Sequence, residues 1–323
     1  MRVNSNCTIS SIKDAATALR EGNLVAFPTE TVYGLGADAQ NKDAVAKIYK
    51  AKGRPTDHPL IVHLSTIEHL DKWASDIPDY AIALARAFWP GPMTLILSRT
   101  ELAKNFITGG QDNVGIRVPS HTVALALLKE FESQGGLGIA APSANRFGKL
   151  SPTTAEDVHL ELFNYLKPKD LILNGGQSSI GVESTIINCT QDLPTILRPG
   201  AITPNIIKDT LGIPIKMESK IQENKVRTSG LLESHYAPIA KVFILGKPKA
   251  GDGLIAMKSF PTPPGVIRLA DPVDSDEFAR VLYKALRLAD EKKLERVFVI
   301  PPTGDDIAVA INDRLRRCAF KSG

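Results

Sequence analysis

The chain has 323 residues, of which 43% are hydrophobic, 23% are charged and 6% are aromatic. This composition excludes collagen-like, coiled-coil and disordered proteins, and the length favours two domains of unequal size. No apolar run approaches the ~18 residues that a membrane helix needs, and the first residues lack the apolar stretch of a signal peptide. We therefore expect a cytoplasmic protein that has no membrane partner.

The charged residues are divided unevenly along the chain. Residues 1–200 carry 19 Lys and Arg against 20 Asp and Glu, whereas residues 201–323 carry 20 against 15. This mild basic excess permits contact with nucleic acid but lacks the dense basic stripe that would argue for it. Cys7, Cys189 and Cys318 lie far apart and form no C-x-x-C pair, which argues against a disulfide framework or a cysteine-based zinc site and favours a reducing compartment.

The first two hundred residues alternate short apolar runs with helical patterns. The run at 24–27 predicts a buried strand that delivers residues 29–31 to its carboxyl end, and a helix from Asp43 should stop near Gly53 and Pro55. Further strands are expected at 60–64, 94–97, 114–118, 138–141, 171–173 and 185–187, with helices around 79–88 and 121–133 and a glycine-rich loop at 174–181. This alternation predicts the mixed α/β class.

A polar stretch at about 216–233 separates this region from a second apolar series that begins at residue 240. The second series alternates strand, helix, strand and helix, which is typical of a small parallel α/β domain. We therefore divide the chain into a large domain at 1–212, a linker at 213–239 and a small domain at 240–323.

Three cations, Lys50, Lys52 and Arg54, lie within five residues at the end of the first long helix. They could simply complement the negative end of the helix dipole. Alternatively, Gly53 and Pro55 fix the backbone around Arg54 so that its guanidinium points one way, as an anion site requires. Both interpretations are open on these residues alone.

Other polar residues give weaker signals. Ser143 and Asn145 follow a strand of small residues and could contact a ligand or cap a helix, and 181–185 could form an anion-binding nest or only a turn. The Walker and G-x-G-x-x-G motifs are both absent. His58 and His63 have no third potential ligand nearby at the spacing of a metal site. Arg117 lies within an apolar strand, so its charged group must reach a carboxylate, a ligand or the polar edge of the strand.

Six motifs follow one another along the chain: Phe27–Gly36, Lys50–Pro55, Trp89–Pro92, Ala141–Asn145, Gly181–Thr185 and Leu197–Gly200. This ordered and highly specific set resembles the threonylcarbamoyl-AMP synthase family and covers roughly residues 10–205. Ser234–Pro238 and the tail resemble the linker and C-terminal domain of the family's long form. The resemblance implies a YrdC-like catalytic domain with a concave twisted mixed sheet, followed by the linker and a small Rossmann-like parallel α/β domain.

The resemblance also implies a reaction. A nucleotidyltransferase of this kind condenses L-threonine, bicarbonate and ATP to threonylcarbamoyl-AMP and pyrophosphate, and the adenylate serves the threonylcarbamoyladenosine modification of tRNA. Mg²⁺ would accompany ATP, and no tightly bound organic cofactor is expected. A downstream threonylcarbamoyl transferase would receive the product, and the resemblance leaves direct contact with tRNA open.

The matching motifs imply the residues of the site. Lys52 and Arg54 would be catalytic, and L-threonine would be bound by Thr31, His63, Arg117, Ala141 and Ser184. The nucleotide would be bound by Lys50, Arg54, His58, Asn113, Ser143, Asn145, Ser151, Arg198 and Tyr236. His58 stands where the family usually has Asn and Asn113 where Thr is common, although both side chains can still form hydrogen bonds. No carboxylate cluster identifies ligands for Mg²⁺.

The sequence of the linker predicts a mobile segment. Its flanks are polar and weakly patterned, yet His235 and Tyr236 followed by Pro238 make a rigid aromatic patch. We expect this segment to act as a lid that excludes water from the reactive carbamate and adenylate.

Two other functions are weighed against this one. The basic second part is compatible with a noncatalytic RNA-binding module, but the threonine and nucleotide motifs argue against it. A carbamoyltransferase that makes carbamoyl-adenylate for metal-cofactor maturation is also related, but such proteins carry acylphosphatase and zinc-finger segments that this sequence lacks.

Overall fold

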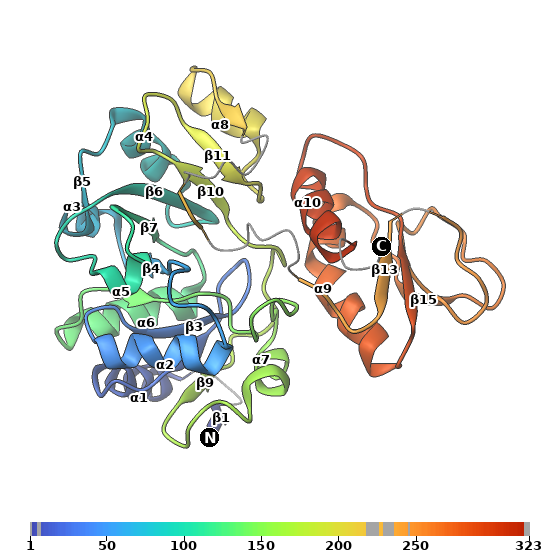
Figure 1. Cartoon of the computed structure of the whole chain (residues 1–323), viewed down its shortest axis with the longest axis horizontal. Coiled ribbons are helices and arrows are strands. Elements are labelled where there is room, and N and C mark those ends of the chain that lie inside the picture. Colours follow the sequence, from blue (N-terminus) through green and yellow to red (C-terminus); the bar gives the residue numbers. More distant parts are fainter. Residues whose placement is uncertain (1, 5–7, 218–225, 229–235, 245, 320–323) are drawn as a thin grey trace.

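The computed structural model describes residues 2–4, 8–217, 226–228, 236–244 and 246–319. Within them the chain forms a large domain and a smaller one, each built around its own sheet (Figure 1). Much of the predicted linker, including Ser234 and His235, lies outside the described residues, so the lid hypothesis remains a prediction. No helix among the described residues is long and apolar enough to cross a membrane.

The large sheet is mixed, since β4 is parallel to β7 while β6 is antiparallel to β7. The short strand β5 (Ala74–Ser75) pairs with β6 alone. In spatial order the other strands are β1 (Arg2–Asn4), β9 (Leu171–Leu173), β2 (Val25–Phe27), β3 (Gly34–Asp38), β8 (Ile139–Ala140), β4 (Ile61–His63), β7 (Asn113–Arg117), β6 (Met93–Arg99), β10 (Thr185–Asn188), β11 (Thr195–Arg198) and β12 (Lys216–Met217). The predicted mixed α/β class is confirmed.

Helices cover this sheet. They are α1 (Ile9–Arg20), α2 (Lys42–Lys52), α3 (Leu70–Trp73), α4 (Asp79–Phe88), α5 (Asn105–Thr108), α6 (Thr122–Ser133), α7 (Ala155–Leu162) and α8 (Pro204–Leu211), with the 3₁₀ turn η1 (Ile67–His69). The sequence predicted α2, α4 and α6. It did not predict α1, whose buried face consists largely of the small residues Ala15, Ala16 and Ala18 with Leu19.

The small sheet is wholly parallel, in the order β13 (Lys241–Phe243), β16 (Arg296–Val299), β14 (Gly253–Ile255) and β15 (Ile267–Ala270). Helices α9 (Ser275–Glu291) and α10 (Ala308–Ala319) accompany it. The predicted parallel α/β domain is present, although β14 and β15 were not predicted.

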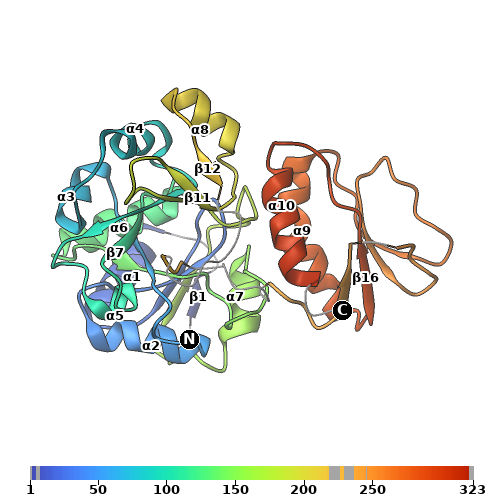
Figure 2. The same cartoon turned by 45° about the horizontal axis from the view of Figure 1, so that its top comes forward.

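The two domains pack tightly against each other. In Figures 1 and 2, α9 and α10 lie on the side of the small sheet that faces the large domain. Val32, Leu150 and Val182 of the large domain share one buried cluster with the apolar face of α9. At Gly181, where φ is +87°, a Cβ atom would lie 2.5 Å from the carbonyl oxygen of Ala279. Only glycine therefore permits this approach of the α9 backbone.

Candidate active site

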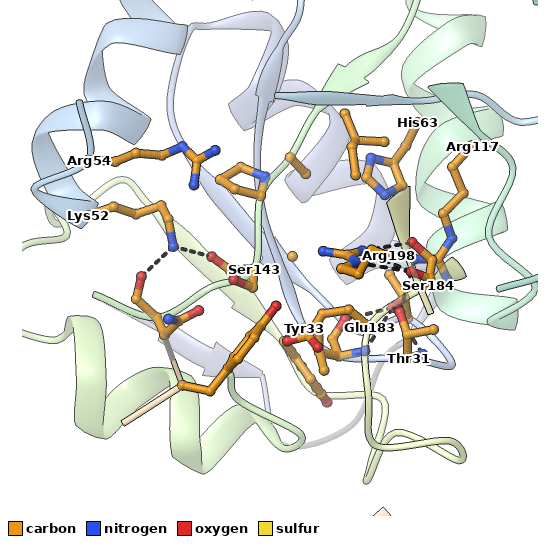
Figure 3. Close-up of a pocket in the computed structure, with 18 of the residues that line it drawn as sticks. Thr31, Tyr33, Lys52, Arg54, His63, Arg117, Ser143, Glu183, Ser184 and Arg198 are labelled. Carbon is orange, nitrogen blue, oxygen red and sulfur yellow. Dashed lines mark hydrogen bonds between the residues drawn. The ribbon is translucent and has the colours of Figure 1, made fainter. Parts of the chain in front are cut away.

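A cleft in the large domain gathers most of the predicted site residues (Figure 3). Its walls come from the loop between β2 and β3, the end of α2, strands β4 and β7, the loop after β8, and the loop and strands around β10 and β11. The predicted residues that line it are Thr31, Lys52, Arg54, His63, Arg117, Ala141, Ser143, Asn145, Ser184, Arg198 and Tyr236.

The end of α2 carries two cations into the cleft. Its N-terminus is capped by Asn41, whose side chain accepts a hydrogen bond from the Ala44 amide at 3.0 Å. It ends at Gly53, which has the left-handed φ of 62° that glycine adopts readily. A Cβ there would also lie 2.7 Å from the Arg146 guanidinium. Gly53 thus sets the turn that places Arg54 after Lys52.

Lys52 and Arg54 are both buried and both donate to main-chain oxygens. The Lys52 ammonium donates to the carbonyl oxygen of Ser143 at 2.5 Å and to that of Asn145. Arg54 donates to the Pro59 carbonyl oxygen at 3.0 Å, and its guanidinium lies 5.7 Å from the Phe147 ring centroid. Burial, followed by the nearby Arg54, holds the pKa of Lys52 well below its usual value, and burial lowers the pKa of Arg54 to about 10.

The opposite end of the cleft is organised around Arg117 (Figure 3). Its guanidinium donates to the Gly91 carbonyl oxygen at 3.2 Å and to the Thr31 hydroxyl at 2.9 Å, and pairs with the Glu30 carboxylate at 2.7 Å. The expectation that this buried cation must find a partner is confirmed. His63 lies nearby, and burial together with the charge of Arg117 lowers its pKa to about 3, so it is neutral at physiological pH.

Hydroxyl groups connect this end to β10 and β11. The Ser184 hydroxyl lies 2.8 Å from that of Thr94 and 3.1 Å from the Arg198 guanidinium. Arg198 also donates twice to the Ser184 carbonyl oxygen, at 3.1 and 3.0 Å. The loop 181–185, which the sequence left open between a turn and an anion nest, therefore supports a serine hydroxyl inside the cleft.

Glu183, for which the sequence predicts no role, lines the cleft beside Ser184. It accepts hydrogen bonds from Ser151 at 2.5 Å, from Tyr283 at 3.1 Å and from Arg314 at 2.8 Å. Tyr283 and Arg314 belong to α9 and α10 and lie 100 and 131 residues away in sequence. No local pattern could have predicted these partners.

The remaining predicted residues lie around the cleft. Lys50 is exposed on α2, since side chains two residues apart do not share a helix face. The His58 ring contacts the ring of Phe147 edge-on, with centroids 5.3 Å apart, and Ser151 reaches the cleft through Glu183. Asn113 lines a neighbouring hollow together with Arg227 and Thr228.

Tyr236, at the end of the predicted linker, is buried and lines the cleft. Its ring stacks on that of Tyr283 with centroids 5.8 Å apart. The described residues contain no group of three or more His, Cys, Asp or Glu side chains that could hold a metal ion.

Comparisons with known proteins agree along the whole chain. Residues 17–200 match the family described as "Telomere recombination", and residues 202–319 match the family "Threonylcarbamoyl-AMP synthase, C-terminal domain". The chain is 39% identical to the threonylcarbamoyl-AMP synthase of Pyrococcus abyssi, over 95% of this chain and 94% of that protein. It is 42% identical to that of Bacillus subtilis, over 95% and 92% of the two chains.

Solved structures give the same result. The crystal structure of P. abyssi Sua5 complexed with L-threonine has a TM-score of 0.88 at 37% identity, covering 99% of this chain and 97% of that one. Full-length HypF has a TM-score of 0.50 at 20% identity over 58% of this chain, which shows a shared fold alone.

Fold and sequence together define an ATP-dependent, adenylyl-transferring enzyme. The chain belongs to the threonylcarbamoyl-AMP synthase family. It makes threonylcarbamoyl-AMP for tRNA modification, which excludes the noncatalytic RNA-binding and carbamoyltransferase alternatives.

Proposed function

We propose that the two ends of this cleft bind the two larger substrates, with the triphosphate of ATP at Lys52 and Arg54 and the carboxylate of L-threonine at Arg117. The observation that carries the assignment is the presence of separate cation groups at opposite ends of one cleft (Figure 3). A guanidinium forms paired hydrogen bonds with a carboxylate, and buried ammonium and guanidinium groups suit phosphate oxygens.

The end of the cleft around Arg117 offers hydrogen-bonding groups that suit a small amino acid. The hydroxyls of Thr31 and Ser184 lie within the hydrogen-bond network of Arg117 and Arg198, so they can orient the polar groups of a small amino acid. Neutral His63 adds no second charge beside Arg117, and Ala141 leaves space for the ligand. This end therefore suits a short zwitterion better than a polyanion.

The nucleotide end continues from Lys52 toward Tyr236. Ser143 and Asn145 hold Lys52 through their carbonyl oxygens, and the buried side-chain oxygen of Asn145 has no hydrogen-bond partner within the described residues. Arg198 and Tyr236 complete this wall. His58 and Ser151 would act through Phe147 and Glu183, while the placements of Lys50 and Asn113 give no direct support to a nucleotide contact.

The chemistry follows from this arrangement. The threonine nitrogen attacks the carbon of bicarbonate, water is lost, and a carbamate forms. A carbamate oxygen then attacks the α-phosphorus of ATP, and the bond from that phosphorus to the bridging oxygen breaks to release pyrophosphate. The carbamate is a weak nucleophile, so the rate depends on alignment and on cations that stabilise the developing phosphate charge. Mg²⁺ would arrive with ATP.

The proposal also covers the recipient of the adenylate, the binding of tRNA and the compartment of the reaction. The adenylate is hydrolysable, so a threonylcarbamoyl transferase should receive it directly, and tRNA would be bound by that partner or by the basic second part of this chain. Cys189 and Cys318 are free and buried, as suits a reducing cytoplasm.

The test is a pyrophosphate-release assay in which each substrate is omitted in turn. The proposal predicts release only when L-threonine, bicarbonate and ATP are all present, together with an AMP-containing product. A threonine-dependent yield of ADP and phosphate would contradict it. Release without threonine would instead indicate carbamoyl-adenylate chemistry.

A further inference from the structure

A buried ion network joins the C-terminal domain to the wall of the cleft. Arg314, in α10, has a fully buried side chain with 0% exposure. Its guanidinium donates to the Glu183 carboxylate at 2.8 Å, to the Asp313 carboxylate at 2.7 Å and to the Pro199 carbonyl oxygen at 3.1 Å. A single side chain of the small domain therefore contacts the two loops that flank β10 and β11.

Glu183 is charged at neutral pH. Burial alone would raise the pKa of its carboxyl group, but the cations Arg314 and Arg198 outweigh burial and hold it at about 2. Two guanidinium groups, one from each domain, therefore stabilise this carboxylate. Arg198 is at the same time the donor to the carbonyl and hydroxyl oxygens of Ser184.

Removing Arg314 would leave Arg198 as the remaining one of the two cations that stabilise this carboxylate. The attraction would draw Arg198 away from Ser184, because charged pairs within a protein interior interact strongly. The uncompensated charge of Glu183 would also act on Arg198 and Tyr236, in the wall of the cleft that we propose for the nucleotide, and would repel a polyanion there with little solvent screening.

The same helices fix Tyr236. The Arg314 guanidinium lies 5.4 Å from the Tyr236 ring centroid, the Tyr283 ring stacks on the Tyr236 ring with centroids 5.8 Å apart, and the Cys318 thiol donates to the Tyr236 carbonyl oxygen at 2.7 Å. The small domain therefore contacts the cleft at Glu183 and at Tyr236 together.

We infer that Arg314 is a positioning residue for the reaction: by neutralising Glu183 it keeps Arg198 on Ser184 and keeps the nucleotide end of the cleft positive. The C-terminal domain thereby completes the active site of the large domain. This inference rests on the placement of ATP proposed above.

The test uses the full-length protein and steady-state kinetics with each substrate varied. We expect R314M to raise the KM for ATP by about tenfold or more, since a buried charge has lost its partner. E183Q/R314M should recover most of this loss because the unpaired carboxylate is gone, whereas a defect of packing alone would persist in the double variant. R314K, which retains the charge, should be less impaired than R314M.

The matched control is R317M, in the same helix. Arg317 pairs with both carboxylate oxygens of Asp313, at 3.0 and 3.1 Å, and is not among the residues that line the cleft, so the KM of R317M for ATP should stay within about twofold of the parent. Thermal unfolding of every variant identifies loss of folding. If R314M does not fold, R314K and E183Q/R314M carry the test, and a tenfold rise in KM for ATP in both would overturn the inference.

A folded R314M with the parent KM for ATP would also overturn it, as would a double variant as impaired as R314M. R54A is measured alongside to separate the two proposals. A defective R54A with a normal R314M rejects only the role of Arg314, whereas a normal R54A rejects the placement of ATP itself.

Discussion

The two ends of the cleft hold their cations in different ways. At the end that we propose for the nucleotide, Lys52 and Arg54 donate to main-chain carbonyl oxygens, which carry only partial charges. At the end that we propose for L-threonine, Arg117 pairs with the full negative charge of Glu30 at 2.7 Å. The second end is therefore balanced within the protein, which suits a zwitterionic amino acid, while Lys52 and Arg54 are the cations proposed for the phosphates of a polyanion.

Burying the two cations Lys52 and Arg54 has an energetic cost. Burial lowers the pKa of both Lys52 and Arg54, which means that the folded protein holds these charges at the expense of solvation. A bound phosphate would restore the lost electrostatic stabilisation.

The largest expected effect comes from removing a cation at the nucleotide end. Lys52→Ala and Arg54→Ala should each lower turnover more than tenfold, because a charge-assisted contact contributes roughly 1.5–3 kcal/mol. Lys42→Ala, at the exposed start of the same helix, is the control and should retain activity. Near-normal turnover in a folded Arg54→Ala protein would return these cations to a role in stabilising the helix end.

At the threonine end, Arg117→Lys keeps the charge but loses the planar fork. We expect the KM for L-threonine to rise by about tenfold, a loss typical of one good charge-assisted hydrogen bond, with a much smaller change in the KM for ATP. Equal changes for both substrates would show that the two ends do not bind separate ligands. Thermal unfolding checks that the pair with Glu30 is not simply required for folding.

The neutral state of His63 gives a pH-dependent stability. Its pKa is about 3 in the folded protein against about 6.5 in an unfolded chain, so the unfolded state binds the proton first as pH falls. Folding stability should decrease between about pH 6.5 and 3, by up to about 1.4 kcal/mol per pH unit. Urea unfolding of His63→Gln at pH 7 and pH 5 should show a smaller loss than the parent. An identical loss would mean that His63 is not the group responsible.

The smallest effect is expected from a substitution at the C-terminal end of α2. Gly53→Ala should destabilise the protein by about 1 kcal/mol, because alanine is strained in the left-handed region and its methyl group would press on Arg146. Turnover should fall as well, since Arg54 follows directly. Calorimetry and kinetics on this variant, with Gly212→Ala as a control at a left-handed helix end that has open space, separate strain from crowding.

Local patterns in the sequence predicted the elements that carry the nucleotide end. The spacing of Ala44, Val45 and Ile48, with Gly53 after them, was sufficient to predict helix α2 and its end. The same reasoning required a partner for Arg117 but could not identify Glu30, and it gave no role to Glu183, whose partner Arg314 lies 131 residues away. Contacts between distant segments depend on packing, which periodicity does not encode. The substrates and site residues came from the family resemblance.

The most direct measurement is a crystal structure with L-threonine and a nonhydrolysable ATP analogue bound together. The account predicts the threonine carboxylate at Arg117, with Thr31 and Ser184 beside it, and the phosphates within hydrogen-bond distance of Lys52 and Arg54. Phosphates bound at Arg117, or a nucleotide bound outside this cleft, would contradict the division of the cleft into two chemically distinct ends.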